Sequence, residues 1–203
     1  MPIENCRRLP FTIELILYKK LVLLSKNCFM SEAEKIKLAV ERTTKALSLK
    51  PTLGKGTGIS KTRIKNGLTC EIQEGNWKFL ADMPESVGGN AQGPTPGVYG
   101  RAALGSCLAI GYMMKAAEVN IPIAMLEVEV QADYDDGALF GTADVDPDYS
   151  QVRYIVTIES EAAEQDILKM LDDADLHSPY LDVFSRAQNC KREAHIVSSK
   201  IQL

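Results

Sequence analysis

Hydrophobic positions near the start of the chain change from an interrupted apolar run to regular helical spacing. Ser31 and Glu34 have the spacing of a capping box, and apolar residues recur with a helical period after them. This pattern predicts a helix over residues 30–49. Residues 50–58 contain several glycines and a proline and predict a linker.

Short segments with strand character follow the linker. The turn signal Asn66-Gly67 separates the first two, as is typical of a hairpin. The segments are bounded by Gly, Asn and Glu, and they predict an antiparallel meander of three strands, at residues 59–65, 68–73 and 77–83.

The most apolar segment covers residues 98–120 and is rich in Ala, Gly, Leu and Met. Its apolar residues lie nearly all the way round a helix, which predicts a central, buried helix that ends before Pro122. Ser160 is expected to cap a later helix that runs to about residue 174. The remaining expected elements are strands at 123–133, 152–158 and 194–203, and a short helical segment at 176–188 that Pro179 interrupts. Because helices and strands do not alternate regularly, the fold class predicted is α+β.

The first 29 residues have a pattern of their own. Their apolar run, residues 9–24, imitates a signal peptide, but Glu14, Lys19 and Lys20 interrupt it and make it unsuited to spanning a bilayer. We therefore expect an N-terminal extension at 1–29, with Met30 as a natural start, followed by the helix at 30–49 and one domain at 50–203. The alternative is that residues 1–29 form an amphipathic helix that packs on the domain.

Composition narrows the possible partners. The net charge of −4 gives no reason to expect nucleic acid or an anionic membrane, since both attract basic surfaces. The chain has five cysteines, an odd number without CxxC spacing, and only two histidines. We therefore expect free thiols in a reducing compartment such as the cytoplasm, with no metal and no cofactor.

Residues 88–107, GGNAQGPTPGVYGRAALGSC, resemble the OsmC/Ohr family of osmotically induced and organic hydroperoxide resistance proteins. The similarity lies in a Gly-rich loop with a G-P-x-P turn, placed eleven residues before a cysteine in an Ala-rich helix. The resemblance implies an OsmC-like fold, in which an antiparallel sheet wraps around a long central helix. It also implies an intertwined homodimer with active sites at its interface, and thiol-dependent reduction of hydroperoxides.

The resemblance assigns the reactive, peroxidatic cysteine to Cys107. Such a cysteine must attack peroxide as a thiolate, whereas most buried free cysteines are small core residues. The family's glutamate ten residues earlier is replaced here by Gly97. The family's second cysteine, which resolves the sulfenic acid as a disulfide, is replaced by Ser178 in a Ser178-Pro179 pair. That pair is also explained as a helix N-cap followed by proline at the first helical position.

A cation beside the thiolate is the other part that the resemblance implies. Arg63 is a weak candidate for it, with Lys65 as the alternative, although Arg63 is also explained as a solvated strand residue. Arg101 lies six positions before Cys107, about 240° around a helix, and we expect it on the opposite flank. Cys190 and Cys70 are not expected to resolve Cys107, and no third partner makes His177 and Ser178 a hydrolase pair.

Two hypotheses remain. The first is a thiol-dependent peroxidase that lacks the usual Glu and resolving Cys, reduces a small apolar hydroperoxide through Cys107, and takes electrons from an external thiol. The second is a non-enzymatic dimer of the same fold that binds a small apolar ligand or acts as a redox-responsive protein. The presence of Cys107 favours the first, and Gly97 and Ser178 favour the second.

Overall fold

The computed structural model describes residues 30–197. Helix α2 (Glu32–Leu49) begins with the capping box that the sequence predicts: the Glu34 N–H donates to Ser31 Oγ at 3.2 Å, and the Ser31 N–H donates to Glu34 Oε2 at 2.8 Å. The hypotheses about residues 1–29 fall outside the described residues. Residues 194–197 form no strand, so the final strand expected at 194–203 is wrong over its described part.

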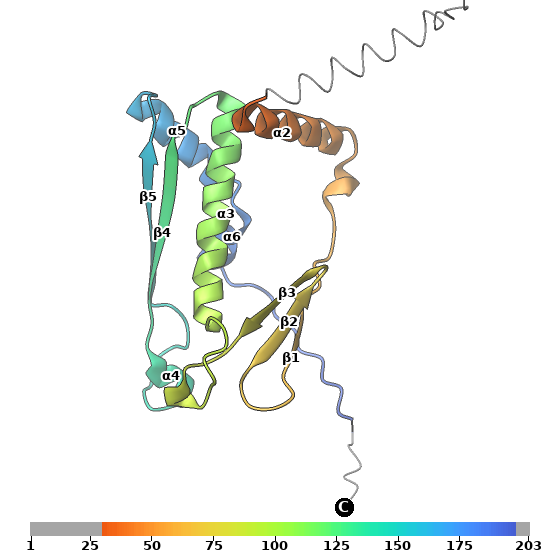
Figure 1. Ribbon diagram of the computed structural model, residues 1–203, viewed down its shortest axis with the longest axis vertical. Helices are drawn as coiled ribbons and strands as arrows, with labels where there is room; N and C mark the ends of the chain where they lie inside the picture. The colour runs from red at the N-terminus through yellow and green to blue at the C-terminus, as the bar shows by residue number, and fades with distance from the viewer. Residues whose placement is uncertain (1–29, 198–203) are drawn as a thin grey trace, which may run out of the picture.

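The three-stranded meander is present as an antiparallel sheet in the order β1–β2–β3 (Figure 1). A 3-10 turn (Pro51–Gly54) leads to it. Lys61 pairs with Gln73 and Arg63 with Glu71, so the β1–β2 register is centred on Gly67, whose φ is +66°. The turn is therefore wider than the two residues Asn66-Gly67. The strands are β1 (Lys61–Arg63), β2 (Cys70–Glu74) and β3 (Trp77–Ala81).

Asp82 organises the loop that joins the meander to the long helix. Its carboxylate is 2% exposed and accepts hydrogen bonds from Thr69 Oγ1 at 2.7 Å and from three backbone N–H groups, those of residues 83, 90 and 92. Gly93 lies so close to β3 that a Cβ there would come within 2.6 Å of the Leu80 carbonyl oxygen. These contacts fix the loop, including a 3-10 turn at Glu85–Val87, and thereby the start of the next helix.

Low pH should lower the stability of the fold, because the Asp82 carboxylate becomes protonated. Burial alone would raise the pKa of Asp82, but the hydrogen bonds from Thr69 and the backbone together hold it below its ordinary value. The stabilisation is therefore complete above about pH 4 and is lost as pH falls through the lowered pKa. Asp82→Asn should lower the melting temperature at pH 7 and much less at pH 2.5. An equal loss at both pH values in a thermal melt would contradict this assignment.

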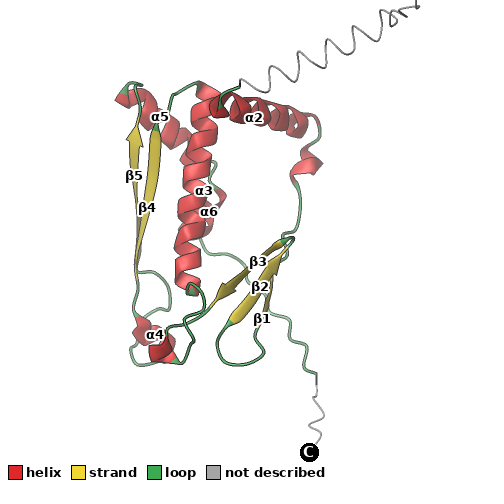
Figure 2. Ribbon diagram, in the orientation of Figure 1, coloured by secondary structure: helices red, strands yellow, loops and turns green. Residues whose placement is uncertain are grey.

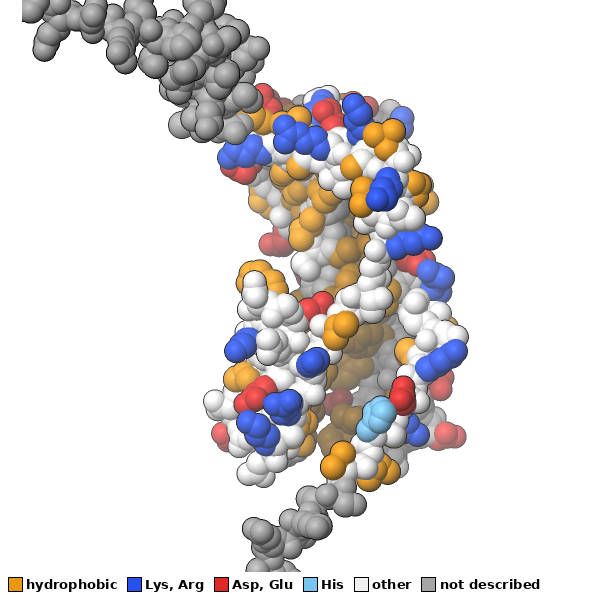
Figure 3. All heavy atoms as spheres, turned by 90° about the vertical axis from the view of Figure 1, so that its right-hand side faces the viewer, with side chains coloured by type: hydrophobic (Ala, Val, Ile, Leu, Met, Phe, Trp, Pro, Cys, Tyr) orange, Lys and Arg blue, Asp and Glu red, His pale blue; other side chains and the backbone are white. Residues whose placement is uncertain are grey.

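Helix α3 (Pro96–Val119) is the central element. Thr95 occupies its N-cap position, Pro96 its first turn, and Asn120 ends it with φ of +60°. Leu104, Leu108 and other side chains of one face are buried, as expected for a central helix, whereas apolar side chains on another face are exposed in the single chain. Ile110 is 60% exposed and Met114 is 44% exposed. Hydrophobic side chains also gather in the hollow between α2 and the meander (Figure 3).

A second sheet and two helices cover the buried face of α3 (Figure 2). Strands β4 (Met125–Asp133) and β5 (Gln151–Glu159) are antiparallel, with Met125 opposite Glu159, and the short helix α4 (Asp136–Phe140) lies between them in the chain.

Helix α5 (Glu164–Asp175) begins after Ala163, so the prediction that Ser160 caps it is wrong. The Ser160 hydroxyl donates to the Pro122 carbonyl oxygen instead. Helix α6 (Pro179–Ser185) follows directly. The fold is α+β, with two antiparallel sheets within residues 30–197. None of the helices within residues 30–197 is both long enough and apolar enough to cross a membrane.

Candidate active site

Cys107 and Ser178 meet although 71 residues separate them in sequence. Cys107 is half-buried in the middle of α3, and Ser178 is 9% exposed in the turn between α5 and α6. The Cys107 Sγ lies 3.7 Å from the Ser178 Oγ. The structure thus brings together the two positions that the sequence resemblance pairs as reactive and resolving residues.

Ser178 also has the capping role that its local sequence predicts. Its Oγ accepts a hydrogen bond from the Leu181 N–H at 3.4 Å, and Pro179 occupies the first turn of α6. The Ser178 N–H donates to the Asp175 carbonyl oxygen at 3.1 Å. The serine is therefore fixed by both neighbouring helices, and its hydroxyl points toward Cys107 while it caps α6.

Asp175 connects the turn to the rest of the core. Its two carboxylate oxygens accept hydrogen bonds from the hydroxyls of Tyr112 on α3, at 2.7 Å, and Tyr154 on β5, at 2.8 Å. Burial first, and then the hydrogen bond and charge of Asp175, raise the pKa of Tyr154 to about 12 and raise that of the more deeply buried Tyr112 as well. Both tyrosines therefore remain protonated donors at neutral pH. The Ser178 turn is held against the helix that carries Cys107.

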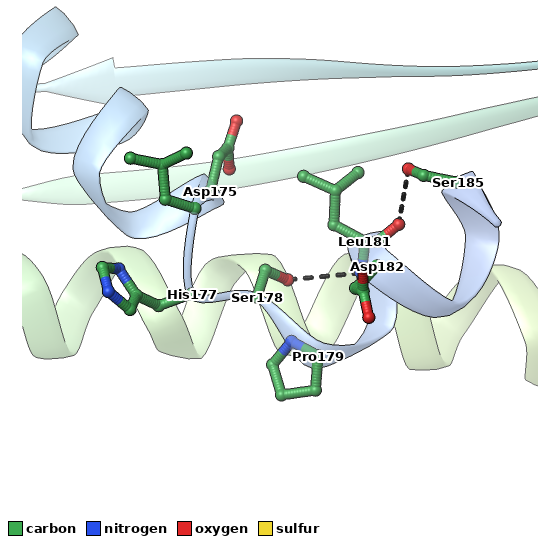
Figure 4. A pocket seen from close by; sticks show the side chains of 8 residues that line it. Asp175, His177, Ser178, Pro179, Leu181, Asp182 and Ser185 are labelled. Carbon is green, nitrogen blue, oxygen red and sulfur yellow. Dashed lines mark hydrogen bonds between the residues drawn. The ribbon is translucent and has the colours of Figure 1, made fainter.

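An open pocket of about 550 Å³ lies along this turn. Figure 4 shows the His177 ring turned away from the Ser178 hydroxyl, and His177 Nδ1 instead lies 2.8 Å from the Asp173 carbonyl oxygen. Asp182 is paired with Arg186. The pocket is lined by Asp175, Leu176, His177, Ser178, Pro179, Leu181, Asp182 and Ser185. A small molecule in it would reach the serine that faces the thiol.

Among residues 30–197 of the single chain, no cation is bonded to the sulfur of Cys107. Arg63 is exposed on β1, and among residues 30–197 no hydrogen bond or ion pair joins it to Cys107 or Ser178. Arg101 lies over the start of α3: a Cβ at Gly97 would meet its Nη1 at 3.3 Å and the Tyr149 hydroxyl at 3.6 Å. No cation is bonded to Cys107 within the described part of the chain, and Gly97 has no carboxylate that could order one.

The other described cysteines lie elsewhere. Cys70 is on β2, Cys190 is exposed beyond α6, and both are free thiols, as is Cys107. The part of the chain that the structure describes holds no group of three or more His, Cys, Asp or Glu side chains arranged for a metal ion. A thiol and a hydroxyl are thus the reactive groups that the site brings together.

Comparison with known proteins agrees with the family resemblance found in the sequence. The family model described as OsmC-like protein matches residues 88–192, which include both Cys107 and Ser178. Among curated proteins, no match is found.

Solved structures share the fold at low sequence identity. An OsmC-like protein from Mycoplasma pneumoniae is 14% identical with a TM-score of 0.56, and the match covers 64% of this chain and 89% of that one. A protein from Psychrobacter arcticus named for osmotic stress induction and a detoxification response is 21% identical with a TM-score of 0.50, covering 63% and 88%. An organic hydroperoxide resistance protein from Legionella pneumophila is 16% identical with a TM-score of 0.48, covering 63% and 88%.

Proposed function

This chain belongs to the family of OsmC-like proteins, and on that basis we propose that it reduces organic hydroperoxides through the thiol of Cys107. A stress-related role is supported at the level of the family, since the Psychrobacter relative of the same fold is named for osmotic stress and detoxification. The reaction, the substrate and a reducing compartment such as the cytoplasm are our proposals for this chain.

The observation that carries the proposal is the placement of Cys107. Cys107 is half-buried, its sulfur lies 3.7 Å from the Ser178 hydroxyl oxygen, and that serine, though not Cys107 itself, lines an open pocket of about 550 Å³. A cysteine that only fills the core needs neither a polar neighbour nor a pocket. The pocket has room for a small organic hydroperoxide.

The proposed reaction begins with attack of the Cys107 thiolate on the terminal oxygen of a hydroperoxide, ROOH. The S–O bond forms as the O–O bond breaks, so that sulfur loses two electrons and the peroxide gains them. The alkoxide leaves and takes a proton from water, which gives the alcohol ROH. The terminal oxygen keeps its hydrogen, and Cys107 becomes a sulfenic acid.

An external thiol must then restore Cys107, because Ser178 cannot form a disulfide. One thiol molecule condenses with the sulfenic acid and releases water, and a second thiol cleaves the mixed disulfide. Cys70 lies on β2 and Cys190 beyond α6, and both are free thiols in the described residues, so the proposed cycle takes its second thiol from another molecule.

A second function is favoured by one specific observation. Gly97 supplies no carboxylate, and the described residues place no cation on Cys107. A protein of this fold with an unassisted thiol would act as a non-enzymatic dimer that binds a small apolar ligand or responds to redox state. The reactivity of Cys107 toward peroxide separates the two functions.

Stoichiometric cumene hydroperoxide should oxidise Cys107 to a sulfenic acid that persists, because residues 30–197 place no second thiol in contact with it. A dimedone-type trap followed by peptide mass spectrometry should label the peptide that contains Cys107. Cys107→Ser should abolish the label, whereas Cys190→Ser should leave it intact. If Cys107 reacts with peroxide no faster than a free thiol at the same pH, the enzymatic proposal is wrong and the binding function is preferred.

A further inference from the structure

We infer that the Ser178 hydroxyl is a catalytic hydrogen-bond donor to the Cys107 sulfur, in a site where the described residues place no cation on that sulfur. The inference rests on the proposed thiol chemistry of Cys107 and gives Ser178 an active part in it. On this inference Ser178 takes part in the reaction, although it stands where the family resemblance implies a resolving cysteine.

The hydrogen bonds of Ser178 define which way its proton points. A serine hydroxyl has one proton to donate and two lone pairs that accept. The oxygen already accepts the Leu181 N–H at 3.4 Å. Among the described residues, the Cys107 Sγ at 3.7 Å is the other polar atom within hydrogen-bonding distance of Ser178 Oγ. The hydroxyl proton is therefore free to be donated to sulfur.

The direction of this contact depends on the state of the sulfur. A neutral thiol is only a weak donor and a weak acceptor, so its contact with the hydroxyl contributes little. A thiolate accepts from the hydroxyl in a charge-assisted hydrogen bond, which is stronger. The Ser178 hydroxyl therefore binds the thiolate, the form of Cys107 that attacks peroxide, more strongly than it binds the neutral thiol.

Two features hold the hydroxyl in place before the thiolate forms. Ser178 is 9% exposed, and its N–H is bonded to the carbonyl oxygen of Asp175. The Asp175 carboxylate is itself held by Tyr112, on the same helix as Cys107, and by Tyr154 on β5. Asp175 is thus a positioning residue that ties the Ser178 turn to α3. A donor fixed in this way loses little freedom when it binds the thiolate.

The test uses iodoacetamide, a small neutral reagent that alkylates thiolates, on the full chain, with peptide mass spectrometry to follow Cys107 alone. Ser178→Ala should lower the alkylation rate of Cys107 at pH 7 by roughly tenfold or more, since one hydrogen bond to a charged group contributes about 1.5 kcal/mol at the lower end of its range. Above about pH 10 the two rates should converge, because a thiol ionises there without help.

Further variants distinguish the effect of the Ser178 hydroxyl on the Cys107 sulfur from its effect as the N-cap of α6. Ser178→Gly also lacks the hydroxyl but costs little as an N-cap, and it should show the same loss at pH 7. Ser178→Thr keeps the hydroxyl and should retain most of the rate. Ser48→Ala is the matched control: it removes a helical hydroxyl that donates to the Thr44 carbonyl oxygen at 2.8 Å on α2, away from the pocket, and should leave the rate unchanged.

Either of two results would overturn the inference. The first is an unchanged rate at pH 7 in both Ser178→Ala and Ser178→Gly. The second is a loss that persists above pH 10, which would show that the serine shapes access to the sulfur without donating to it. If the alkylation results hold but peroxide leaves Cys107 unoxidised, the peroxidase proposal fails and the serine–thiolate contact stands.

Discussion

Replacing Ser178 by cysteine should convert the proposed sulfenic acid at Cys107 into an intramolecular disulfide. The Sγ and Oγ atoms are already 3.7 Å apart, and a disulfide bond of about 2.05 Å forms where the two Cα atoms lie roughly 4.4–6.8 Å apart. After one equivalent of cumene hydroperoxide, the trap signal should disappear, and a non-reducing peptide map should show Cys107 linked to the introduced cysteine.

The same variant should gain stability once it is oxidised. The bond would close a loop of 71 residues, for which the chain-entropy model gives about 4 kcal/mol in the absence of strain. Urea unfolding of the oxidised and reduced forms of Ser178→Cys measures this difference directly. The matched control is Ser185→Cys, further along the same pocket, in which no disulfide should form and the sulfenic acid at Cys107 should still be trapped. A disulfide between Cys107 and Cys190 in the variant, or none at all, would mean that the two sites do not meet in solution.

The fold was predictable where local patterns carry the information. The capping box at Ser31, the meander and the long helix all follow from residue types at short spacing, and the structure confirms them. Ser160 shows where such reasoning fails. A serine before an acidic turn predicts an N-cap, but its hydroxyl binds the Pro122 carbonyl oxygen, 38 residues away, and α5 starts later. Here a contact with a distant residue, and not the local sequence, determines what the Ser160 hydroxyl binds.

The site was predictable only in part, for the same reason. The spacing of the GPTP turn and Cys107 allowed the resemblance to place Cys107 opposite Ser178, and the two residues do lie side by side. Nothing in the sequence pairs Asp175 with Tyr112 and Tyr154, because those contacts join three elements and leave no local pattern. Helical spacing favours Tyr112 as a core residue on α3, and it is one, with a hydroxyl that donates to Asp175.

Neither the sequence pattern nor the structure of the single chain assigns a role to Arg63. Its strand pairs in a register centred on Gly67, and a shift of one residue would reverse the face on which Arg63 lies. In the single chain it is exposed and forms no ion pair with the described residues. Its role therefore stays a prediction that depends on what packs against the meander.

We expect the protein to be a homodimer in solution, because one face of α3 is too apolar to remain in water. Ile110 and Met114 lie three and seven positions after Cys107, on the same stripe of the helix, and are 60% and 44% exposed. Light scattering after size exclusion should give about twice the 22.3 kDa chain mass. A clean monomer at micromolar concentration would rule this out.

A charge on the stripe should separate the two copies. Ile110→Glu would place a carboxylate in the interface, and burying an unpaired charge costs several kcal/mol, enough to dissociate most dimers at micromolar concentration. Leu168→Glu, which puts the same charge on the exposed outer face of α5, should remain a dimer. Because Cys107 shares the stripe, the monomeric variant should also lose peroxide reactivity while keeping its secondary structure by circular dichroism. If Ile110→Glu stays dimeric and fully reactive, the contact between copies lies on another face, and the site is complete within one chain.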